Sequence, residues 1–591
     1  MENLAIARVL GEIADLLELK DENPFKIRAY RNAAQVVAET GDRVADLGEA
    51  GLKGLPGIGK DLAGRILEIC SSGTCTLRQE LLVEFPESIL ELLHLQGVGA
   101  KTVALIYRSL NIATLDDLEQ AATAGAVRKL RGMGEKKELL ILKAIAERRL
   151  HEGRHLLADT ADMADKLVAY LREQAPGAAI DAVGSLRRGS ETCGDLDILV
   201  SGADASIMEA FTRFPQVERV LGRGETKSSV LLWKGFQADL RLVPTESRGA
   251  ALQYFTGSKA HNIALRQRAI DQGLLLNEYG LFRTLDGDAG DAGDTGNADS
   301  GETGARIAGE SEEGIYRALG LDYIDPSLRE NRGEIAAAAA HALPRLITLQ
   351  DLRGDLHMHT VETDGKDDIE TMARAALALG YDYIAITDHS QSLAMANGLD
   401  ETRALAHAAR IREIGARLDG ITLLAGIECD IRPDGTMDLA DDCLAQLDLV
   451  IASVHSQFTM EPAQMTARML RAIENPYVDI IGHATGRMLL RREPYQVDVD
   501  ALLKAAAARG VAFEINSQIY RLDLNDVQAR LAKQRGVKLV ISSDAHSQRG
   551  LDVVRWGVQV ARRAWLEPGD VLNTKPLADF RNALRRQAAH A

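Results

Sequence analysis

The sequence predicts a multi-domain protein with an all-α N-terminal region, an α+β middle region and a C-terminal barrel of seven βα units. Three observations predict this order. A glycine pattern recurs three times between the helical stretches of residues 1–150, strand-like runs alternate with helices from about residue 155, and short apolar runs alternate with amphipathic helices after residue 351. With 591 residues, 46% of them apolar, the chain is too long for one compact core and fits roughly three to five domains.

Domain boundaries are expected where these patterns change. The expected parts are residues 1–80 and 81–150 (helical), 151–245 and 246–326 (α+β), 327–350 (a helical linker), 351–575 (the barrel) and 576–591 (a tail). Residues 286–313 interrupt the fourth part with one basic and nine acidic side chains, in a run of Gly, Asp, Ala and Thr that has little to bury. We therefore expect a disordered acidic insert there.

The net charge of −17 argues against a nucleic-acid partner only if its distribution is ignored. Nearly half of the excess lies in the acidic insert, so basic surfaces remain available elsewhere. No apolar run approaches the ~20 residues of a membrane span, the N-terminus lacks a signal-peptide pattern, and the five cysteines form no CxxC pair. We expect a cytoplasmic protein without a membrane partner, in which any metal is held by histidine and carboxylate.

One short pattern recurs in the helical region, as Leu55-Pro56-Gly57-Ile58-Gly59, Leu95-Gln96-Gly97-Val98-Gly99 and Leu130-Arg131-Gly132-Met133-Gly134. Its glycines permit a tight turn and expose backbone N–H groups at the start of a helix, where an anion is favoured. A single copy is as often a plain turn. Three copies resemble the helix-hairpin-helix element, which holds DNA backbones without reading their sequence. The resemblance implies phosphate contacts at Gly57, Gly59, Lys60, Gly97, Gly99 and Lys101.

The middle region carries a pair of aspartates close to a glycine-serine segment. Asp195 and Asp197 lie two apart in a strand-like run, so both carboxylates face one side while the residue between them faces a core. Such a pair repels unless a cation lies between, and oxygen ligands suit Mg²⁺. Asp239, in a later strand-like run, would complete a two-metal site for displacement at phosphorus. The alternative, a solvated strand face, leaves the neighbouring Gly184-Ser185 unexplained.

Gly184-Ser185-Leu186-Arg187-Arg188-Gly189, followed by Gly194-Asp195-Leu196-Asp197, resembles the nucleotidyltransferase signature of family X DNA polymerases, the family of DNA polymerase beta. Tyr254-Phe255-Thr256-Gly257-Ser258 extends the resemblance, which covers about residues 5–325. It implies a nucleotidyltransferase palm at 151–245, a nucleotide-selecting subdomain at 246–326, and two Mg²⁺ ions held by Asp195, Asp197 and Asp239. It further implies that the nucleotide or the template contacts Ser185, Arg188, Tyr254, Phe255, Gly257, Asn262 and Arg266.

One position departs from the family pattern. Members with a 5′-deoxyribose phosphate lyase carry a lysine nucleophile in the helix after the first hairpin, where this chain has Arg65. A guanidinium stays protonated and does not readily form a Schiff base. Lyase activity is therefore not expected from Arg65, although Lys60 is a nearby amine.

Seven apolar runs after residue 351 end in polar residues, and six of these ends carry His, Asp or Glu. From His357 the steps to the next run end are 32, 39, 27, 28, 33 and 28 residues, each the length of one βα unit. A barrel brings the C-terminal ends of its strands to one mouth, where active sites are built. A single histidine there is more often a structural residue. Six run ends that deliver His, Asp or Glu to one mouth would be costly without a metal.

The series His-x-His, Thr-Asp-His, Gly-x-Glu, Ser-x-His, Gly-His and Ser-Asp-x-His resembles the polymerase and histidinol phosphatase (PHP) domain over about residues 351–575. The resemblance implies a distorted (βα)7 barrel and phosphoester hydrolysis. Mn²⁺ or Zn²⁺, and also Fe²⁺, suit such mixed imidazole and carboxylate ligands. Asp367 lies close to Asp364 in the sequence and is its alternative. The implied ligands are His357, His359, Asp364, His389, Glu428, His455, His483, Asp544 and His546.

Together the resemblances imply a monomeric DNA polymerase that fills short gaps in DNA repair and a metal-dependent 3′-5′ exonuclease, with abasic-site endonuclease or 3′-phosphatase activity as further options. The implied partners are gapped or nicked double-stranded DNA and dNTPs. A DNA-tethered small-molecule phosphatase of histidinol-phosphate type is one alternative, but it leaves Arg187, Arg188 and Tyr254-Phe255 unexplained. A non-catalytic DNA-end scaffold is another, and it leaves the three aspartates unexplained.

Deletion of residues 288–303 is expected to leave folding, primer extension and primer shortening nearly unchanged, because a polar loop closes at small entropic cost whatever its length. DNA affinity at low salt should rise as local negative charge is lost. Melting temperature, both activities and DNA binding at two salt concentrations, compared with the intact chain, check this expectation. A large fall in melting temperature would show instead that the segment is packed.

Overall fold

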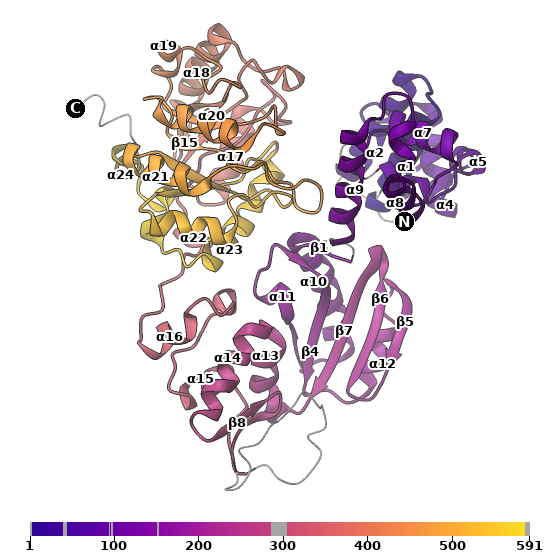
Figure 1. Cartoon of the computed structure of the whole chain (residues 1–591). Coiled ribbons are helices and arrows are strands. Elements are labelled where there is room, and N and C mark those ends of the chain that lie inside the picture. The colour runs from indigo at the N-terminus through magenta and orange to yellow at the C-terminus, as the bar shows by residue number, and fades with distance from the viewer. Residues whose placement is uncertain are drawn as a thin grey trace. The chain divides into compact units, whose positions relative to one another are not determined.

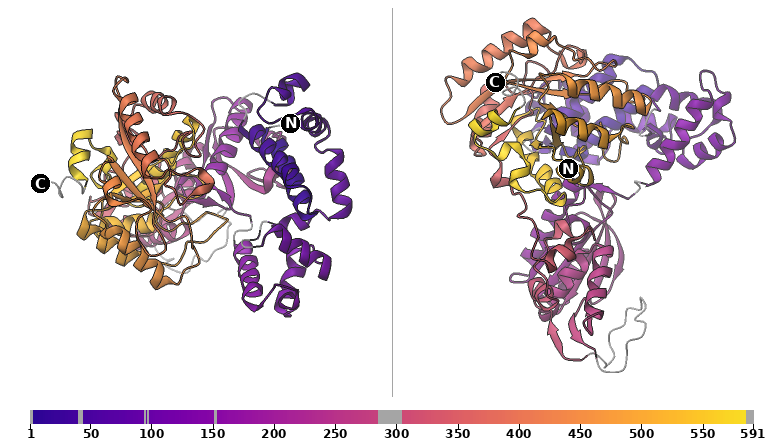
Figure 2. Two further views of the ribbon diagram at one scale, coloured as in Figure 1. Left: turned by 90° about the horizontal axis from the view of Figure 1, so that it is seen from above. Right: turned by 60° about the vertical axis from the view of Figure 1, so that its left-hand side comes forward.

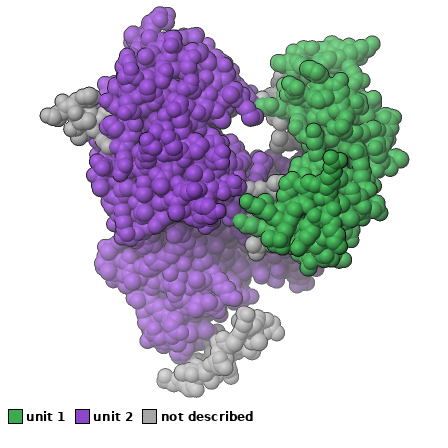
Figure 3. Space-filling view, turned by 45° about the horizontal axis from the view of Figure 1, so that its top comes forward, with its two compact units in different colours: residues 1–152 green, residues 153–591 purple. Residues whose placement is uncertain are grey.

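The structure, a computed structural model, describes residues 3–39, 44–93, 95, 98–150, 153–284 and 304–584. The chain divides into two compact units, residues 1–152 and residues 153–591 (Figure 3). Gly97 and residues 285–303, which hold most of the expected acidic insert, lie outside the described residues. Within the described part of the chain, no helix is long and apolar enough to cross a membrane.

The first unit consists of helices, as the sequence predicts. Although we expected separate domains at 1–80 and 81–150, buried side chains from Ile6 to Ile145 form a single hydrophobic cluster, so the unit has one core. The helices are α1 (Asn3–Leu19), α2 (Pro24–Glu39), α3 (Gly48–Lys53), α4 (Lys60–Ser72), α5 (Thr76–Glu84), α6 (Ile89–Leu93), α7 (Ala100–Leu110), α8 (Leu115–Thr123) and α9 (Glu135–Leu150).

The described residues of the recurring glycine pattern make the same backbone hydrogen bond in all three copies. The apolar residue between the glycines, Ile58, Val98 or Met133, is buried and donates its backbone N–H to the leucine three positions earlier. Gly57 and Gly132 have φ values of +73° and +78°, which L side chains rarely adopt. A helix starts two residues after each buried residue: α4 at Lys60, α7 at Ala100 and α9 at Glu135. Each turn therefore leads into helical N–H groups that have no partner within the helix.

The second unit begins with a five-stranded sheet in the order β2-β4-β7-β6-β5. β4 (Asp195–Ser201) and β7 (Phe236–Val243) are parallel neighbours, and the other pairs are antiparallel. α10 (Leu157–Gln174) and α12 (Ser206–Thr212) share one hydrophobic cluster with these strands. The remaining elements are β1 (His155–Leu156), β2 (Ala179–Ala182), α11 (Gly184–Arg187), β3 (Thr192–Cys193), β5 (Val217–Arg223) and β6 (Lys227–Leu232).

Helices and a three-stranded antiparallel sheet, in the order β10-β9-β8, follow this first sheet (Figure 1). Their core surrounds Tyr316, whose side chain is fully buried. The elements are α13 (Arg248–Thr256), α14 (Lys259–Ile270), β8 (Leu274–Asn277), β9 (Gly280–Arg283), β10 (Arg306–Ala308), α15 (Glu312–Ala318) and α16 (Glu334–Ala339).

Two expected boundaries in this region are wrong. The acidic insert was expected to reach Glu313, but β10 pairs with β9, and Glu312 is buried in contact with Arg187 and Arg329. Residues 327–350 were expected to be a linker, but Leu328 and Ala338 belong to the core of this region. The contacts that order residues 304–313 involve partners distant in the sequence.

The C-terminal region is a barrel of seven parallel strands in sequential order, which confirms the predicted (βα)7 fold. A bridge between Met358 and Ala545 joins the segments after the first and last strands and closes the sheet. Helices cover the outside of the strands (Figure 2), as parallel crossovers require. The elements are β11 (Gly354–Asp355), α17 (Ile369–Ala378), β12 (Tyr383–Ile386), α18 (Glu401–Gly415), β13 (Thr422–Asp430), α19 (Asp441–Leu444), β14 (Leu449–Ser453), α20 (Pro462–Glu474), β15 (Ile480–Ile481), α21 (Val499–Arg509), β16 (Ala512–Asn516), α22 (Asp526–Gln534), β17 (Leu539–Ser542) and α23 (Val554–Arg563).

The described part of the expected tail, residues 576–584, is folded. It forms α24 (Leu577–Ala583), whose Phe580 is fully buried and stacks on Tyr383 with ring centroids 5.2 Å apart. Tyr383 is the first residue of β12, so Phe580 fills the end of the barrel at which the strands begin. The expected boundary at residue 575 is therefore wrong, because α24 completes the barrel core.

Candidate active sites

The three aspartates of the middle region lie on two neighbouring parallel strands. Asp195 and Asp197 flank buried Leu196 on β4, and the register pairs Asp197 with Asp239 on β7. The three carboxylates therefore face the same side of the sheet. Burial, together with the charges of Asp195 and Asp239, raises the pKa of Asp197 to about 6. A divalent cation among the carboxylates would relieve this repulsion, so the oxygen donors fit Mg²⁺.

The segment before these strands approaches the carboxylates closely. Gly184 has a φ of +65°, and a Cβ atom built there would lie 2.6 Å from Asp197 Oδ2. Any side chain at this position would therefore collide with the carboxylate. Ser185 is the next residue, in α11.

The two arginines of this segment have different partners. Arg187 donates from both terminal nitrogens to buried Glu312, at 2.9 and 2.5 Å. Arg188 donates from Nε to Glu330 at 3.0 Å and from Nη1 to the Thr256 carbonyl at 2.5 Å. Among the described residues Arg188 Nη2 has no hydrogen-bond partner. Arg187 is thus held by the fold, whereas Arg188 keeps one nitrogen available for an anion.

The predicted aromatic pair lies at the end of α13. The rings of Tyr254 and Phe255 meet edge to face with centroids 5.0 Å apart. The guanidinium carbon of Arg241, a β7 residue two positions after Asp239, lies 4.5 Å from the centre of the Phe255 ring. This cation–π contact connects the aromatic pair to the strand that carries the third carboxylate.

The other residues predicted to contact the nucleotide or the template differ in how far the fold already engages their side chains. Asn262 donates to the Tyr254 carbonyl and accepts from Gln253, both at 2.7 Å, so its amide is largely occupied by the fold. Gly257 has a φ of +67°, and a Cβ there would lie 3.3 Å from Arg188 Nη1. Arg266 is exposed on α14.

The predicted DNA contacts of the first unit lie at helix starts. Gly59 and Gly99 precede α4 and α7, and Lys60 and Lys101 are exposed in the first turns of these helices. Arg65 stands at the position where the resemblance places the lysine of a lyase, and its Nη1 lies 3.2 Å from Glu68 Oε1.

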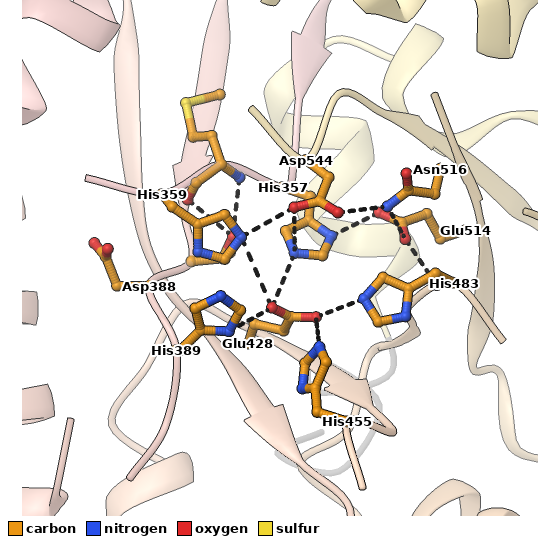
Figure 4. Close-up of polar contacts among 12 residues, drawn as sticks. His357, His359, Asp388, His389, Glu428, His455, His483, Glu514, Asn516 and Asp544 are labelled. Atoms are coloured by element: carbon orange, nitrogen blue, oxygen red, sulfur yellow. Dashed lines mark hydrogen bonds and ion pairs between the residues drawn. The ribbon is translucent and has the colours of Figure 1, made fainter. Parts of the chain in front are cut away.

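Glu428 lies at the centre of the histidines at the barrel mouth (Figure 4). Its Oε1 lies 2.9 Å from His483 Nε2 and 3.3 Å from His455 Nε2. Its Oε2 lies 2.8 Å from His389 Nδ1 and 3.4 Å from His357 Nε2. One carboxylate therefore reaches ligands from four other strand ends.

The remaining predicted ligands join this group from the first and last strand ends. Asp544 Oδ1 lies 3.1 Å from His359 Nε2. Asp364 Oδ2 lies 3.5 Å from both His389 Nε2 and His546 Nε2. Asp367, the alternative to Asp364, instead accepts from the backbone N–H of Gln548. The structure thus brings all nine predicted side chains into one cluster.

The cluster fits metal ions. Three sets of these residues each place one donor atom per residue within 4.8 Å of one another, and all three combine imidazole and carboxylate. Within the part of the chain that the structure describes, buried Glu428 Oε2, His357 Nε2 and His389 Nδ1 form no hydrogen bond, although they lie close together. Burial and the neighbouring His389 and His546 lower the pKa of His359 to about 4, which keeps its nitrogen free to bind a metal. The sets are His359, Asp364, His389 and His546; His357, His359 and Asp544; and His389, Glu428 and His455.

The sixth strand end supplies a carboxylate, Glu514, that the sequence pattern does not mark as part of the site. Glu514 Oε1 lies 2.7 Å from His357 Nδ1, and Glu514 Oε2 accepts the backbone N–H of His483 at 2.8 Å. Asn516 donates to Asp544 at 3.0 Å. The spacing in the sequence shows that Glu514 and Asn516 stand at a strand end. It does not show that their side chains contact His357 and Asp544. A hydrogen-bond partner on the ring nitrogen that does not bind the metal fixes the tautomer of a metal-binding histidine.

Five family models match separate parts of the chain. They are a helix-hairpin-helix domain over residues 1–75, a SAM-like helix-hairpin-helix tandem over 89–147, a DNA polymerase beta palm over 158–231, a DNA polymerase beta thumb over 251–330 and a PHP domain over 355–518. Asp195 and Asp197 fall in the palm match, and the predicted barrel ligands from His357 to His483 fall in the PHP match. Asp239, Asp544 and His546 lie beyond the matched ranges.

Whole-chain similarity points to the same pair of activities. The DNA polymerase/3′-5′ exonuclease PolX of Bacillus subtilis (strain 168) is 36% identical over 589 residues, which cover 99% of this chain and 100% of that protein. A probable phosphatase of Thermoanaerobacter sp. (strain X514) is 30% identical over 232 residues, 37% of this chain and 89% of that protein. A probable phosphatase of Shewanella sp. (strain MR-4) is 30% identical over 234 residues, 38% of this chain and 88% of that protein.

Glu514→Gln is expected to weaken metal retention by the barrel by roughly 10- to 100-fold, because it removes the charge that orients His357. Metal content after dialysis against graded chelator measures this change without relying on activity. The matched control is Glu362→Gln, which alters a nearby carboxylate that pairs with Arg403 and Arg410 instead of the histidines. Equal retention in both variants would contradict the assignment.

Proposed function

The chain belongs to the bacterial family X DNA polymerases that carry a C-terminal PHP domain and is a DNA polymerase and 3′-5′ exonuclease; on this basis we propose that it fills short gaps during DNA repair. The observation that carries the proposal is the register that pairs Asp197 with Asp239 beside Gly184 and Ser185. Gapped or nicked duplex DNA and dNTPs are its proposed substrates, and it acts as a monomer.

The polymerase step is assigned to the palm. Asp195, Asp197 and Asp239 would hold two Mg²⁺ ions, which stabilise the attacking and leaving oxygens of an in-line displacement. The parallel strands orient the three carboxylates before the nucleotide arrives, so the reaction does not require their rearrangement.

The nucleotide is assigned to the surface between α11 and α13. Ser185 and Arg188 would bind the triphosphate, and the available Nη2 of Arg188 supports this role. Gly257 keeps the space beside that guanidinium open. Tyr254 and Phe255 would pack on the sugar and exclude a 2′-hydroxyl. Asn262 and Arg266 would contact the base and the template, with Asn262 acting through the amide hydrogen that the Tyr254 carbonyl does not use.

DNA backbones are assigned to the helix starts of the first unit. Gly57, Gly59 and Lys60 would bind phosphate at one hairpin, and Gly99 and Lys101 at another, with Gly97 assigned by sequence alone. The repeated turn and its exposed lysines support this assignment. Arg65 is proposed to take no covalent part in lyase chemistry.

Exonucleolysis is assigned to the barrel mouth. The nine clustered side chains would hold Mn²⁺ or Zn²⁺, with Fe²⁺ as a further candidate, and such metals activate water for attack on phosphorus. Glu514 and Asn516 would orient His357 and Asp544. The same site is proposed to act at abasic sites or on 3′-phosphates, and the probable phosphatases similar over about the length of the barrel favour the second of these.

Primer extension on a short gap, compared with extension on a long single-stranded template, tests the proposed role. We expect higher kcat/KM on the gapped duplex, because both sides of a gap offer duplex backbone to the hairpins of the first unit. Equal efficiency on the two substrates would argue against gap filling.

Asp197→Ala is expected to reduce nucleotide addition on the order of 1,000-fold, because metal stabilisation of a transition state is worth several kcal/mol and each ~1.4 kcal/mol is a tenfold factor. Affinity for gapped DNA should stay within a few-fold. Single-turnover primer extension and a binding titration measure the two effects. Glu218→Ala, on exposed β5 of the same sheet, is the control and should extend normally. Retained extension by pure Asp197→Ala would refute the metal assignment.

His357→Ala combined with His359→Ala is expected to abolish primer shortening while extension on a short gap persists. Both side chains belong to the barrel cluster, whereas the palm carboxylates lie on a separate sheet. Loss of two ligands weakens metal binding far more than it alters the apolar core. Shortening without dNTPs and extension with dNTPs are followed on one preparation. Unchanged shortening, once contaminating nucleases are excluded, would refute the site.

A further inference from the structure

The nucleotide-binding segment of the palm contacts a helix of the PHP barrel. Arg563, in the last turn of α23, donates from Nη1 to the backbone carbonyl of Arg188 at 2.9 Å. Gln559 Nε2, one helical turn earlier, lies 3.5 Å from the same carbonyl. A Cβ atom at Gly189, in the turn after α11, would lie 2.1 Å from Gln559 Nε2 and 2.3 Å from its Cγ, so this turn and α23 (Figure 1) are closely packed there.

One carboxylate joins the same two arginines through their side chains. Glu330 Oε1 accepts from Arg188 Nε at 3.0 Å and from Arg563 Nη1 at 2.9 Å. Burial alone would raise the pKa of Glu330, but Arg563 and Arg188 lower it, so the carboxylate stays charged. Arg563 is 7% exposed, which makes this a protected contact and not a surface ion pair.

These contacts engage two of the three guanidinium nitrogens of Arg188. Glu330 engages Nε, and the Thr256 carbonyl engages Nη1. Among the described residues Nη2 is left without a partner. The guanidinium is planar, so engagement of two nitrogens fixes the direction in which the third points.

The charges around Arg188 alternate in sign. Glu330 lies between Arg188 and Arg563, and Asp526 of α22 lies between Arg563 and Arg332. The series contains three positive and two negative charges, which leaves one net positive charge. Without Arg563, Glu330 would neutralise Arg188 directly, and the attraction of Arg188 for an anionic triphosphate would fall.

We propose that Glu330 and Arg563 are positioning residues for nucleotide binding by the polymerase, so that the PHP barrel supports the palm's triphosphate site without contacting the nucleotide. The proposal rests on the proposed role of Arg188. It goes beyond the assignment of separate activities to separate domains, because a barrel residue sets the orientation and effective charge of a palm residue.

General docking of the barrel on the palm is the competing explanation. Arg562, the neighbour of Arg563 on α23, pairs with Asp325 at 2.6 Å and donates to the Ile347 carbonyl at 3.0 Å. It joins the same regions of the chain but does not contact Arg188. Arg562→Met is therefore a matched control for Arg563→Met, because each removes one arginine with a carboxylate partner across the interface.

The test measures steady-state extension of a one-nucleotide gap by the full chain, with kcat and the KM for dNTP determined separately. Arg563→Met is expected to raise the KM about tenfold, with kcat changed less than threefold and primer shortening unchanged. Arg562→Met should leave the KM within twofold. Arg563→Lys, which keeps the charge and a donor, should recover most of the lost affinity. An unchanged KM in Arg563→Met, or an equal rise in Arg562→Met, would overturn the proposal.

A double-mutant comparison identifies the route of the effect. If Arg563 acts through Arg188, Arg563→Met should add little to the KM of Arg188→Ala, whereas an additive rise would overturn the proposal. Arg188→Ala by itself tests the proposed nucleotide site. An unchanged KM there would refute that site, while a raised KM with an unaffected Arg563→Met would refute only the positioning role. Melting temperature and the Arg563→Lys variant separate these outcomes from misfolding.

Discussion

One buried and one half-buried carboxylate, each shared between two arginines, hold the segment that begins at Gly184 in place. Glu312 lies between Arg187 and Arg329, and Glu330 lies between Arg188 and Arg563. A buried charge is costly without compensation, and removal of one partner leaves the other unpaired. Burial alone would raise the pKa of Glu312, but Arg187 and Arg329 lower it. The segment that begins at Gly184 is therefore tied on one side to α15 and on the other to the barrel.

At both proposed sites, the register of parallel strands brings the predicted metal ligands together. Like-charged or lone-pair-bearing groups must be brought together before a metal binds, and a flexible loop would let them separate. In the palm, the pairing of β4 with β7 places Asp197 opposite Asp239. In the barrel, seven parallel strands end at one mouth, and Glu428 reaches histidines from four other strand ends. Rigid strands thus supply the preorganisation that metal-dependent phosphoryl chemistry needs.

The contact between α23 and the nucleotide segment gives a physical reason for joining the two activities in one chain. Polymerisation and 3′-5′ hydrolysis act on the same primer end, and α23 follows the strand end that carries Asp544 and His546. The barrel therefore touches the proposed nucleotide-binding segment through the helix that follows two of its proposed metal ligands in the chain. A substitution in the barrel need not affect hydrolysis alone, and its effect depends on which side of α23 it alters.

Sequence patterns were sufficient for the fold class and for the residues at the strand ends, because local periodicity repeats once per βα unit and each strand end carries a distinctive residue type. The paired aspartates were equally visible, since alternation along one strand decides which side chains share a face. Boundaries were less accurate: residues 304–313, 327–350 and 576–584 are ordered by Glu312, Ala338 and Phe580, whose partners are distant in the sequence.

Only the tertiary structure decided which neighbours complete each site. Glu514 binds His357 from a strand 157 residues away, and Arg563 binds the carbonyl of Arg188 across 375 residues. No local spacing encodes such pairs, because they arise where closed sheets and packed helices bring separate segments together. The sequence by itself determined what chemistry the chain carries, through residue types at regular positions. The tertiary structure determined how those residues are oriented and charged, because burial and long-range ion pairs exist only in the folded chain.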